Sequence, residues 1–425
     1  MASKFTDQFG RPIVAVTGIG MVTSLGQGKA DNWAALTSGK SGIHAITRFP
    51  TELLNTRIAG TVDFLPESGM GSSALSYALA AAAAEEAIAE SGINGAFGGP
   101  LFLAAPPVEL EWQHRFALEK ELASESAPGY ARMLEACRAA NHHNYFDASQ
   151  FVTISSRLQE RFGSRGLPIT LSTACASGAT AIQLGVEAIR RGEAARVLSI
   201  GTDGSVSAES LIRFSLLSAL STHNDPAEKA AKPFSKDRDG FVMAEGSAAL
   251  VMESLESAVS RGAKVLGILQ GCGEKADDFH RTRSKPDASP AIGAVRAALA
   301  DAGVAEDAVN YINAHGTSTP ENDKMEFLAI STVFGERISA IPVSSNKSMI
   351  GHTLTAAGAL EAAISLLTMR HGLIPPTINY DNPDPAIPLD TVPNVARAAD
   401  ISMVLSNSFG FGGQNSCLVM AREPN

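Results

Sequence analysis

The stretch "SGATAIQLGVEAIRRG", residues 177–192, is matched further along the chain by "AGALEAAISLLTMRHG", residues 357–372. In each stretch a Gly-Ala pair opens a run of helical length, which closes on an arginine, a second basic residue and a glycine. The spacing between the first and last glycines is the same in both. Small residues at the start and a glycine at the end predict two buried helices that each stop at a left-handed glycine.

The repeat extends beyond these helices. A strand-like run beginning Val-Leu-Ser follows each helix, at Val197 and at Val404, and each part ends on a similar run, "AALVME" from Ala248 and "SCLVMA" from Ser416. Three matching pairs in the same order indicate two related halves, joined near residues 257–264. Short β-branched runs alternate with helical patterns along the whole chain, which is typical of an α/β fold. We therefore predict two similar sheets packed around the paired helices.

The composition excludes several classes of protein. A chain of 425 residues with 45% hydrophobic residues can bury a large core. The net charge of −10 argues against a nucleic-acid partner, because binding phosphates needs clustered Lys and Arg. Apolar runs long enough to span a membrane are absent, and the N-terminus lacks the basic start of a secretion signal. Four widely spread cysteines predict neither a zinc site nor disulfides, and hence a reducing cytoplasm.

Cys175 stands among small residues in "STACASGATA", residues 172–181, at the predicted start of the first repeated helix. The first turn of a helix presents unpaired N–H groups and a partial positive charge, which favour a thiolate. This position predicts a nucleophile whose thiol pKa is lowered by the helix. The alternative is a buried structural cysteine, which is the usual role of this residue type.

Two histidine motifs favour the nucleophile. "INAHGTSTPENDKME" contains His315, and "SSNKSMIGHTLTAAG" contains His352. Both motifs are rich in glycine and hydroxyl residues at predicted strand ends, where ligand sites of α/β folds gather. Cys175 and His352 each shortly precede the opening glycine of a repeated helix. The pseudo-symmetry of the two halves therefore predicts that these two side chains meet.

Two other glycine-rich stretches suggest nucleotide binding only weakly. "GFGGQN", residues 410–415, lacks the Lys-Ser/Thr of a phosphate-binding loop, so its glycines are predicted to let the backbone approach a reacting centre. "GIGMVTSLG", residues 18–26, misses the third spacing of the dinucleotide fingerprint. We expect no NAD site.

Taken together, "TACASG", "NAHGTSTPENDKME", "NKSMIGHTLTAAG" and "NSFGFGGQN" resemble motifs of the elongating β-ketoacyl-acyl-carrier-protein synthases of types I and II, with type II the nearer. The resemblance runs from about Ile13 to the C-terminus. It implies the thiolase fold, in which duplicated α/β halves form a five-layered α-β-α-β-α core. Residues 1–256 would form the N-terminal half with Cys175, and residues 257–425 the C-terminal half with His315 and His352.

The resemblance also implies an activity, the decarboxylative Claisen condensation of fatty acid biosynthesis. An acyl chain passes from the phosphopantetheine thioester of an acyl carrier protein to Cys175. Malonyl-acyl carrier protein then loses CO₂, and its enolate attacks the acyl-enzyme to give a β-ketoacyl chain two carbons longer. No metal or cofactor of the enzyme's own is implied, because the phosphopantetheine arrives on the carrier protein. A homodimer is expected.

By similarity, His315 and His352 hydrogen-bond the malonyl thioester oxygen, and Lys347 orients that site with Glu361 as its counter-ion. The backbone N–H groups of Cys175 and Phe411 would form the oxyanion hole. The resemblance implies that Asp323 and Glu326 support the structure of the site. It also implies that substrate is bound by Thr282, Thr317, Thr319, Phe409 and Phe411. The two phenylalanines stand where the family places a mobile gate, and core packing is the alternative role for Phe409.

The chain departs from the family in residues 106–146, which are longer and bulkier than the usual glycine-rich loop. In the family this region borders the acyl pocket and the dimer interface, so the resemblance does not fix which acyl chain is preferred. Cys137, His142 and His143 lie in this segment, but three ligands leave a zinc site incomplete, and we predict no metal.

The expected docking surface for the carrier protein also differs. Asp63 and Glu67 stand where family members often carry basic residues, whereas Arg281, Arg283 and Lys285 flank the family's His-x-Thr pattern. We predict a relocated docking patch for a specialised carrier protein.

Three other functions compete with general fatty acid elongation. One is a dedicated synthase for an unusual or very long acyl chain. Another is a thiolase-like decarboxylase or hydrolase that does not condense. The third is a non-catalytic subunit that shapes chain length, which the intact Cys175, His315 and His352 argue against.

Overall fold

The computed structural model describes residues 4–121, 129–139 and 142–424. Its main sheet has the strand order β6-β5-β7-β8-β1-β9-β15-β14-β10-β11. The first half comprises β6 (Ile169–Leu171), β5 (Leu101–Ala104), β7 (Arg196–Asp203), β8 (Gly246–Ser254) and β1 (Val14–Thr23). The second half comprises β9 (Gly267–Ala276), β15 (Gln414–Ala421), β14 (Met403–Phe409), β10 (Tyr311–Asn313) and β11 (Val343–Ser344).

The two halves have the same pairing pattern. From the outer edge inward, each half has two parallel pairings followed by two antiparallel ones. They meet where β1 pairs antiparallel with β9, with Val14 opposite Leu269. The predicted duplication is therefore present, and hydrogen bonds join the two predicted sheets edge to edge.

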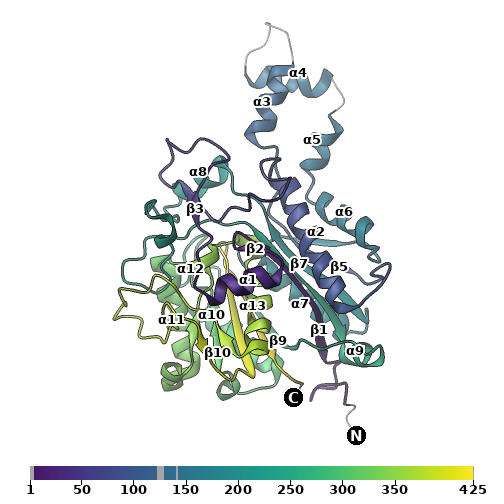
Figure 1. The fold of residues 1–425 in the computed structure, drawn as a ribbon, viewed down its shortest axis with the longest axis vertical. Coiled ribbons are helices and arrows are strands. Elements are labelled where there is room, and N and C mark those ends of the chain that lie inside the picture. The colour runs from purple at the N-terminus through teal and green to yellow at the C-terminus, as the bar shows by residue number, and fades with distance from the viewer. Residues whose placement is uncertain (1–3, 122–128, 140–141, 425) are drawn as a thin grey trace.

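The helices complete five layers (Figure 1). The repeated helices α7 (Ser177–Arg190) and α13 (Ala357–His371) pack against each other between the two half-sheets. Helices α2 (Ser72–Ser91) and α6 (Thr153–Phe162) cover the outer face of the first half, and α10 (Ser289–Ala302) and α11 (Pro320–Phe334) belong to the outer layer of the second. This is the predicted five-layered thiolase fold, and both central helices end at left-handed glycines, Gly192 and Gly372.

Shorter elements connect these layers. They are β2 (Gly26–Gln27), α1 (Lys29–Thr37), β3 (His44–Ala45), β4 (Ile58–Ala59), α8 (Ala208–Leu216), η1 (Ala227–Lys229), α9 (Leu255–Ser260), η2 (Glu306–Ala308), η3 (Gly335–Ala340), α12 (Lys347–Ile350), η4 (Leu354–Ala356), β12 (Leu373–Ile374) and β13 (Arg397–Ala398). None of the described helices is long and apolar enough to cross a membrane.

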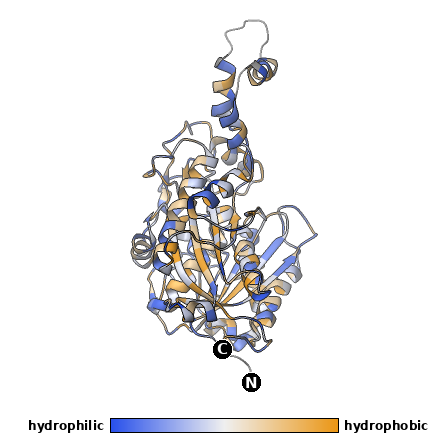
Figure 2. Cartoon of the chain, turned by 90° about the vertical axis from the view of Figure 1, so that its right-hand side faces the viewer, coloured by the Kyte–Doolittle hydropathy of each residue, from blue (hydrophilic) through white to orange (hydrophobic). Residues whose placement is uncertain are grey.

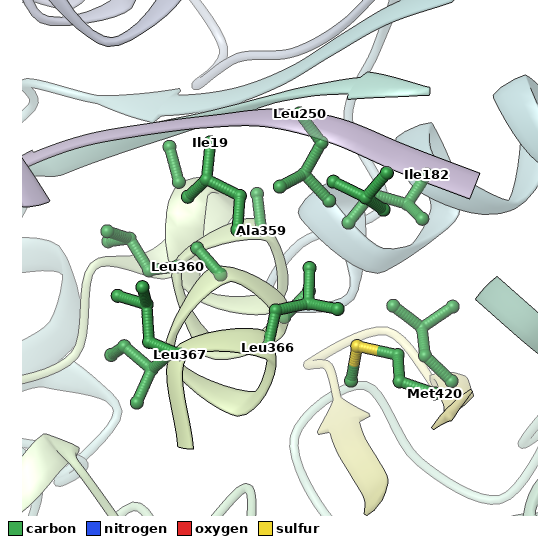
Figure 3. Close-up of a cluster of buried hydrophobic side chains, with 14 of the residues drawn as sticks. Ile19, Ile182, Leu250, Ala359, Leu360, Leu366, Leu367 and Met420 are labelled. Carbon is green, nitrogen blue, oxygen red and sulfur yellow. The ribbon is translucent and has the colours of Figure 1, made fainter. Parts of the chain in front are cut away.

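Successive side chains along the strands point alternately into the central layer and into the outer layers. Leu250 of β8 and Leu418 of β15 point into the central cluster with α7 and α13, whereas their neighbours Val251 and Val419 pack in the outer clusters. Such alternation is what strands covered on both faces produce. Figure 3 shows the central cluster, in which side chains of α13 face side chains of the strands and of α7: Ile19, Ile182, Leu250, Ala359, Leu360, Leu366, Leu367 and Met420.

The glycines of the fingerprint-like stretch have a packing role. A Cβ on Gly18 would lie 1.9 Å from the carbonyl oxygen of Ala87, and one on Gly20 would lie 1.9 Å from that of Ala83. The alanine-rich helix α2 therefore lies directly on the backbone of β1. This close contact explains the glycines without a dinucleotide.

The unusual segment after β5 forms a helical projection. Helices α3 (Trp112–Glu121), α4 (Tyr130–Ala139) and α5 (His143–Ala148) stand off the body of the molecule (Figures 1 and 2). Figure 2 shows hydrophilic residues along much of the projection, whereas the strands of the body are largely hydrophobic. The base of α3 lies beside the start of α2, which places this segment next to the site described below.

Candidate active site

Cys175 lies in a tight turn at the N-terminus of α7. The preceding residue, Ala174, has a left-handed φ of +48°, and the chain enters the helix at Ser177. A Cβ on Gly410 would lie 3.2 Å from the Cys175 backbone nitrogen, so the glycine-rich loop after β14 backs directly onto this turn. The thiol is consequently buried, with 8% of the residue exposed.

Both motif histidines converge on this cysteine. His315 follows β10 and His352 precedes α13, and a donor atom of each lies within 4.8 Å of the other and of the Cys175 sulfur. The two imidazole rings meet edge to face, with centroids 5.3 Å apart. All three side chains are buried. The structure thus brings together the pair that the pseudo-symmetry predicts, and His315 with them.

Hydrogen bonds define the state of the two imidazoles. The Leu354 N–H donates to His352 Nδ1 at 3.3 Å, and the Lys347 ammonium lies 3.3 Å from His315 Nδ1. Burial and the charge of Lys347 hold the pKa of both histidines well below the ordinary value of 6.5. Because a donor faces each Nδ1, the neutral rings carry their proton on Nε2. Each imidazole therefore has one N–H to offer to a ligand.

Lys347 is held in place by several acceptors. Its ammonium forms a buried ion pair with Glu361 of α13 and donates to the His315 carbonyl oxygen at 2.7 Å. Burial raises the pKa of Glu361 to about 7, although the charge of Lys347 opposes the rise. The ion pair links α12 to the central helix, so it fixes the position of the charge beside His315.

One expectation about Cys175 is wrong. Burial raises the pKa of its thiol to about 11 instead of lowering it. A hydrogen bond from the backbone of Phe411 and the charge of Lys347 act in the opposite direction but are weaker. The cost of burying the anion therefore exceeds the stabilisation that the surrounding groups provide.

The two acidic residues of the first histidine motif hold backbone rather than substrate. Glu326 accepts the N–H groups of His315 and Gly316 at 2.8 and 2.7 Å. Asp323 accepts the N–H of Phe234 at 2.7 Å, and burial raises its pKa to about 6. Glu326 thus fixes the loop that carries His315, whereas Asp323 ties α11 to the segment around Phe234.

A cleft leads from the surface to the three converging residues. Phe409 at the end of β14, Phe411 of the glycine-rich loop and three threonines are among the residues that line it, the threonines being Thr282, Thr317 and Thr319. Thr317 and Thr319 hydrogen-bond each other at 2.8 Å, whereas Thr282 lies near His280 of its own loop. We call this the entry cleft.

A second cavity, here the acyl cavity, opens on the other side of Cys175. Its volume is about 1230 Å³ including its open mouth, and it extends between the start of α2, residues 106–111 and α8. Cys175, Phe214, Leu354 and Phe411 line both spaces. The thiol therefore lies where an entry route and a chain-sized cavity join.

The comparisons with known proteins agree with this geometry. The chain matches the "Beta-ketoacyl synthase, N-terminal domain" over residues 12–95 and 125–258, and the "Beta-ketoacyl synthase, C-terminal domain" over residues 266–381. The chain belongs to the β-ketoacyl synthase family. Residues 96–124 lie outside the N-terminal match, so β5 and the start of the projection diverge from the family pattern in this synthase.

Individual relatives cover nearly the whole synthase. It is 38% identical to the tetracenomycin polyketide synthase ketoacyl synthase alpha subunit of Streptomyces glaucescens, over 96% of this chain and 97% of that protein. It is 37% identical to 3-oxoacyl-[acyl-carrier-protein] synthase 2 of Coxiella burnetii, over 96% and 98%. A type II polyketide ketosynthase in complex with its acyl-carrier protein superposes with a TM-score of 0.84 at 31% identity, covering 97% and 100%. A Burkholderia phymatum β-ketoacyl synthase gives 0.82 at 32%, covering 97% and 99%.

Two residues near the site of the synthase were not predicted from the sequence. Asp203, at the end of β7, accepts the Thr355 N–H and hydroxyl at 3.2 and 2.7 Å, which ties the His352 loop to the first half. Phe241 packs edge-on against the His352 ring, with centroids 5.3 Å apart. The strand-end rule that selected the histidines applies equally to Asp203, whereas no local pattern marks Phe241.

Proposed function

We propose that the synthase extends an acyl chain held on Cys175 by decarboxylative Claisen condensation with malonyl-acyl carrier protein. The observation that carries this proposal is the position of Cys175, between the entry cleft and the acyl cavity and beside two neutral imidazoles. A thioester arriving through the cleft reaches the thiol, and its chain has the acyl cavity to occupy.

The first step is acyl transfer. The Cys175 sulfur attacks the acyl thioester carbonyl, the carbon–sulfur bond to the pantetheine breaks, and the thiol proton ends on the departing pantetheine sulfur. The charge of Lys347 and the backbone of Phe411 favour the developing thiolate. The N–H groups of Cys175 and Phe411 act as the oxyanion hole, where one donor typically contributes about 3 to 4 kcal/mol.

The second step uses the two histidines. The Nε2–H groups of His315 and His352 donate to the thioester oxygen of the malonyl group, so its enolate is stabilised as CO₂ leaves. The enolate carbon attacks the acyl-Cys175 carbonyl, and the Cys175 thiolate departs and takes up a proton. This step needs neutral imidazoles that donate hydrogen bonds. The lowered pKa of each histidine keeps its ring neutral at physiological pH.

The substrates are presented by an acyl carrier protein. In this proposal Thr317, Thr319 and Thr282 bind the pantetheine arm in the entry cleft, and Phe409 and Phe411 form the gate between cleft and acyl cavity. The phosphopantetheine comes with the carrier, so the enzyme supplies no cofactor of its own. Cys175, His315 and His352 are also donors that a metal could bind, but the neighbouring Lys347 charge opposes a cation there, and we propose no metal.

We further propose how the protein is organised. The chain divides into halves at residues 1–256 and 257–425, between β8 and β9. It acts as a homodimer, which the exposed edge strand β6 with Ile169 at its start would allow. Its four cysteines are free thiols, which fits a cytoplasmic location.

A substitution of Cys175 tests this function. The Cys175→Gln variant is expected to lose acyl transfer and condensation, while malonyl-carrier decarboxylation continues because both histidines are intact. Mass spectrometry of the carrier-bound products separates the two activities. Condensation by this variant would disprove the mechanism, and unaccelerated decarboxylation by the wild-type protein would disprove the roles of the histidines.

A specialised acyl chain is the second candidate function. Residues 96–124 fall outside the family pattern, and they include part of the lining of the acyl cavity. Iterative extension from malonyl-carrier protein alone, in place of extension of saturated acyl chains, would favour this candidate.

A further inference from the structure

The turn that carries Cys175 has a pseudo-symmetric counterpart in the second half of the chain. Ala174, just before Cys175, has a left-handed φ of +48°, and Leu354, just before Thr355, has a φ of +46°. Each of these two left-handed residues stands four positions before the opening glycine of its repeated helix. Thr355 therefore occupies in the second half the position that Cys175 occupies in the first.

The residue that faces each turn differs between the halves. Gly410, directly after β14, faces the first turn, where a Cβ on it would lie 3.2 Å from the Cys175 nitrogen. Asp203, at the end of β7, faces the second turn and accepts the Thr355 N–H at 3.2 Å. Asp203 and Gly410 each stand six residues after the valine that begins a Val-Leu-Ser run. A carboxylate thus stands in the second half at the position that a glycine holds beside Cys175.

The carboxylate of Asp203 is committed to four contacts within the chain. Its Oδ2 also lies 2.7 Å from the Thr355 hydroxyl, and its Oδ1 accepts the Ser205 N–H and hydroxyl at 3.0 and 2.6 Å. Burial raises the pKa of Asp203, and the hydrogen bonds from Ser205 and Thr355 oppose the rise. A buried carboxylate is costly unless donors surround it. Although Asp203 lines the acyl cavity, its oxygens therefore hold the second turn.

The second turn also sets the surroundings of His352. The Leu354 N–H donates to His352 Nδ1 at 3.3 Å. A left-handed backbone is unfavourable for a residue with a side chain, so it persists only where the surrounding structure holds it. Asp203 holds the next residue, Thr355, and thereby fixes the direction of the Leu354 N–H.

We propose that Asp203 is a positioning residue for His352. By holding Thr355 it keeps the Leu354 N–H aimed at Nδ1, which leaves the proton of the neutral imidazole on Nε2. That Nε2–H is the donor to the malonyl thioester oxygen, so this inference rests on the proposed function.

The kinetic experiment compares Asp203→Ala with the wild-type protein in two reactions. In the proposed mechanism malonyl-carrier decarboxylation uses the Nε2–H of His352, whereas transfer of a short acyl chain to Cys175 does not. Loss of one preorganised donor typically lowers a rate by about 10²–10³, so kcat for decarboxylation is expected to fall by more than about ten-fold. The KM for malonyl-carrier protein is expected to stay unchanged, because the donor acts in the transition state. Equal losses of decarboxylation and acyl transfer would indicate general damage and overturn the proposal.

A spectroscopic experiment tests the tautomer without substrate. Nitrogen NMR of histidine-labelled protein distinguishes protonated from unprotonated ring nitrogens, and a His352→Asn variant identifies the signals of His352. The wild-type ring is expected to carry its proton on Nε2, and Asp203→Ala is expected to give a mixture of the two tautomers. A wild-type ring protonated on Nδ1, or an unchanged tautomer in Asp203→Ala, would overturn the proposal.

Ser205→Ala is the matched control. It removes a hydrogen bond from the Oδ1 atom of the same carboxylate but leaves the contact between Oδ2 and Thr355. Its decarboxylation rate and its His352 tautomer are expected to equal those of the wild-type protein.

If Asp203→Ala does not fold, substitutions of Thr355 decide. Thr355→Val lacks the hydroxyl that contacts Asp203 and is expected to lose decarboxylation, whereas Thr355→Ser keeps the hydroxyl and is expected to keep the wild-type rate. Full decarboxylation by Thr355→Val would overturn the proposal. A wild-type protein that carries the Nε2 proton but does not decarboxylate malonyl-carrier protein would instead disprove the proposed function.

Discussion

Gly178 and Gly358 lie at the crossing of the two central helices. A Cβ on Gly178 would lie 2.5 Å from the Ala359 backbone nitrogen, and a Cβ on Gly358 would lie 2.6 Å from that of Ala179. The contact is the same from both sides, as the repeated sequence requires. It brings the start of α7, with Cys175, against the start of α13, next to His352.

Replacing one of these glycines tests the crossing. Gly358→Ala is expected to lower the free energy of unfolding by about 1–3 kcal/mol, because the added methyl group meets backbone that cannot move aside. Denaturant unfolding measures this loss. Gly293→Ala in α10 is the control, since its Cβ would meet only the flexible Lys275 side chain at 3.2 Å. A helical glycine to alanine change there is expected to be neutral or to stabilise by up to about 1 kcal/mol.

The raised thiol pKa of Cys175 predicts how its reactivity depends on pH. The thiolate fraction, and hence the rate of alkylation by iodoacetamide, is expected to rise from pH 6 to pH 10 without a plateau, because the pKa is about 11. Peptide mass spectrometry resolves Cys175 from the exposed Cys137. A plateau near pH 7 would show an activated thiolate and contradict the burial argument.

The charge of Lys347 predicts the acid limit of decarboxylation. This charge helps hold the pKa of His315 and His352 below its ordinary value, so removing it raises both pKa values. In a Lys347→Met/Glu361→Gln variant, which leaves no unpaired buried charge, the activity is expected to fall at a higher pH than in the wild-type protein. The pH profile of malonyl-carrier decarboxylation measures the shift. A fall in activity at the same pH as in the wild-type protein would contradict a role for Lys347 in lowering the pKa of the two histidines.

The basic loop beside the entry cleft predicts where the carrier protein docks. Arg281 and Arg283 line the cleft, and the Gly412 N–H of the glycine-rich loop donates to the Arg281 carbonyl oxygen at 2.7 Å. Charge reversal at both arginines is expected to raise KM for the carrier substrate several-fold, with a smaller effect at high salt. Lys264→Glu, outside the entry cleft, is the control. Unchanged kinetics in the double reversal would place the docking surface elsewhere.

Most of the fold could be predicted from the sequence because the internal repeat marks the matching helices and strands of the two halves. The paired glycines, the Val-Leu-Ser strands and the closing strands of each half are local patterns, and symmetry turns them into a statement about which residues meet. Cys175 and His352 are near each other for that reason. The glycines of the fingerprint-like pattern, Gly18 and Gly20, are explained by their close contacts with α2 and not by a bound nucleotide.

The electrostatics of the site could not be predicted in the same way. The helix start alone suggests a lowered pKa for Cys175. The thiol is buried, however, among His315, His352 and the glycine-rich loop, which lie far away in the sequence. The hydrogen bond from the Ser72 N–H to Glu111 joins α2 to the segment before α3, across a stretch with no periodic pattern. Such contacts become visible only when the layers are assembled.

The proposed condensation is tested most directly by a single reconstitution with acyl- and malonyl-carrier proteins, followed by mass spectrometry of enzyme and carrier. We expect an acyl adduct on the Cys175 peptide when the acyl carrier is added alone. On addition of malonyl-carrier protein we expect loss of that adduct, with a β-ketoacyl carrier two carbons longer as the product. An acyl adduct on another residue, or a longer product formed without passing through Cys175, would contradict it.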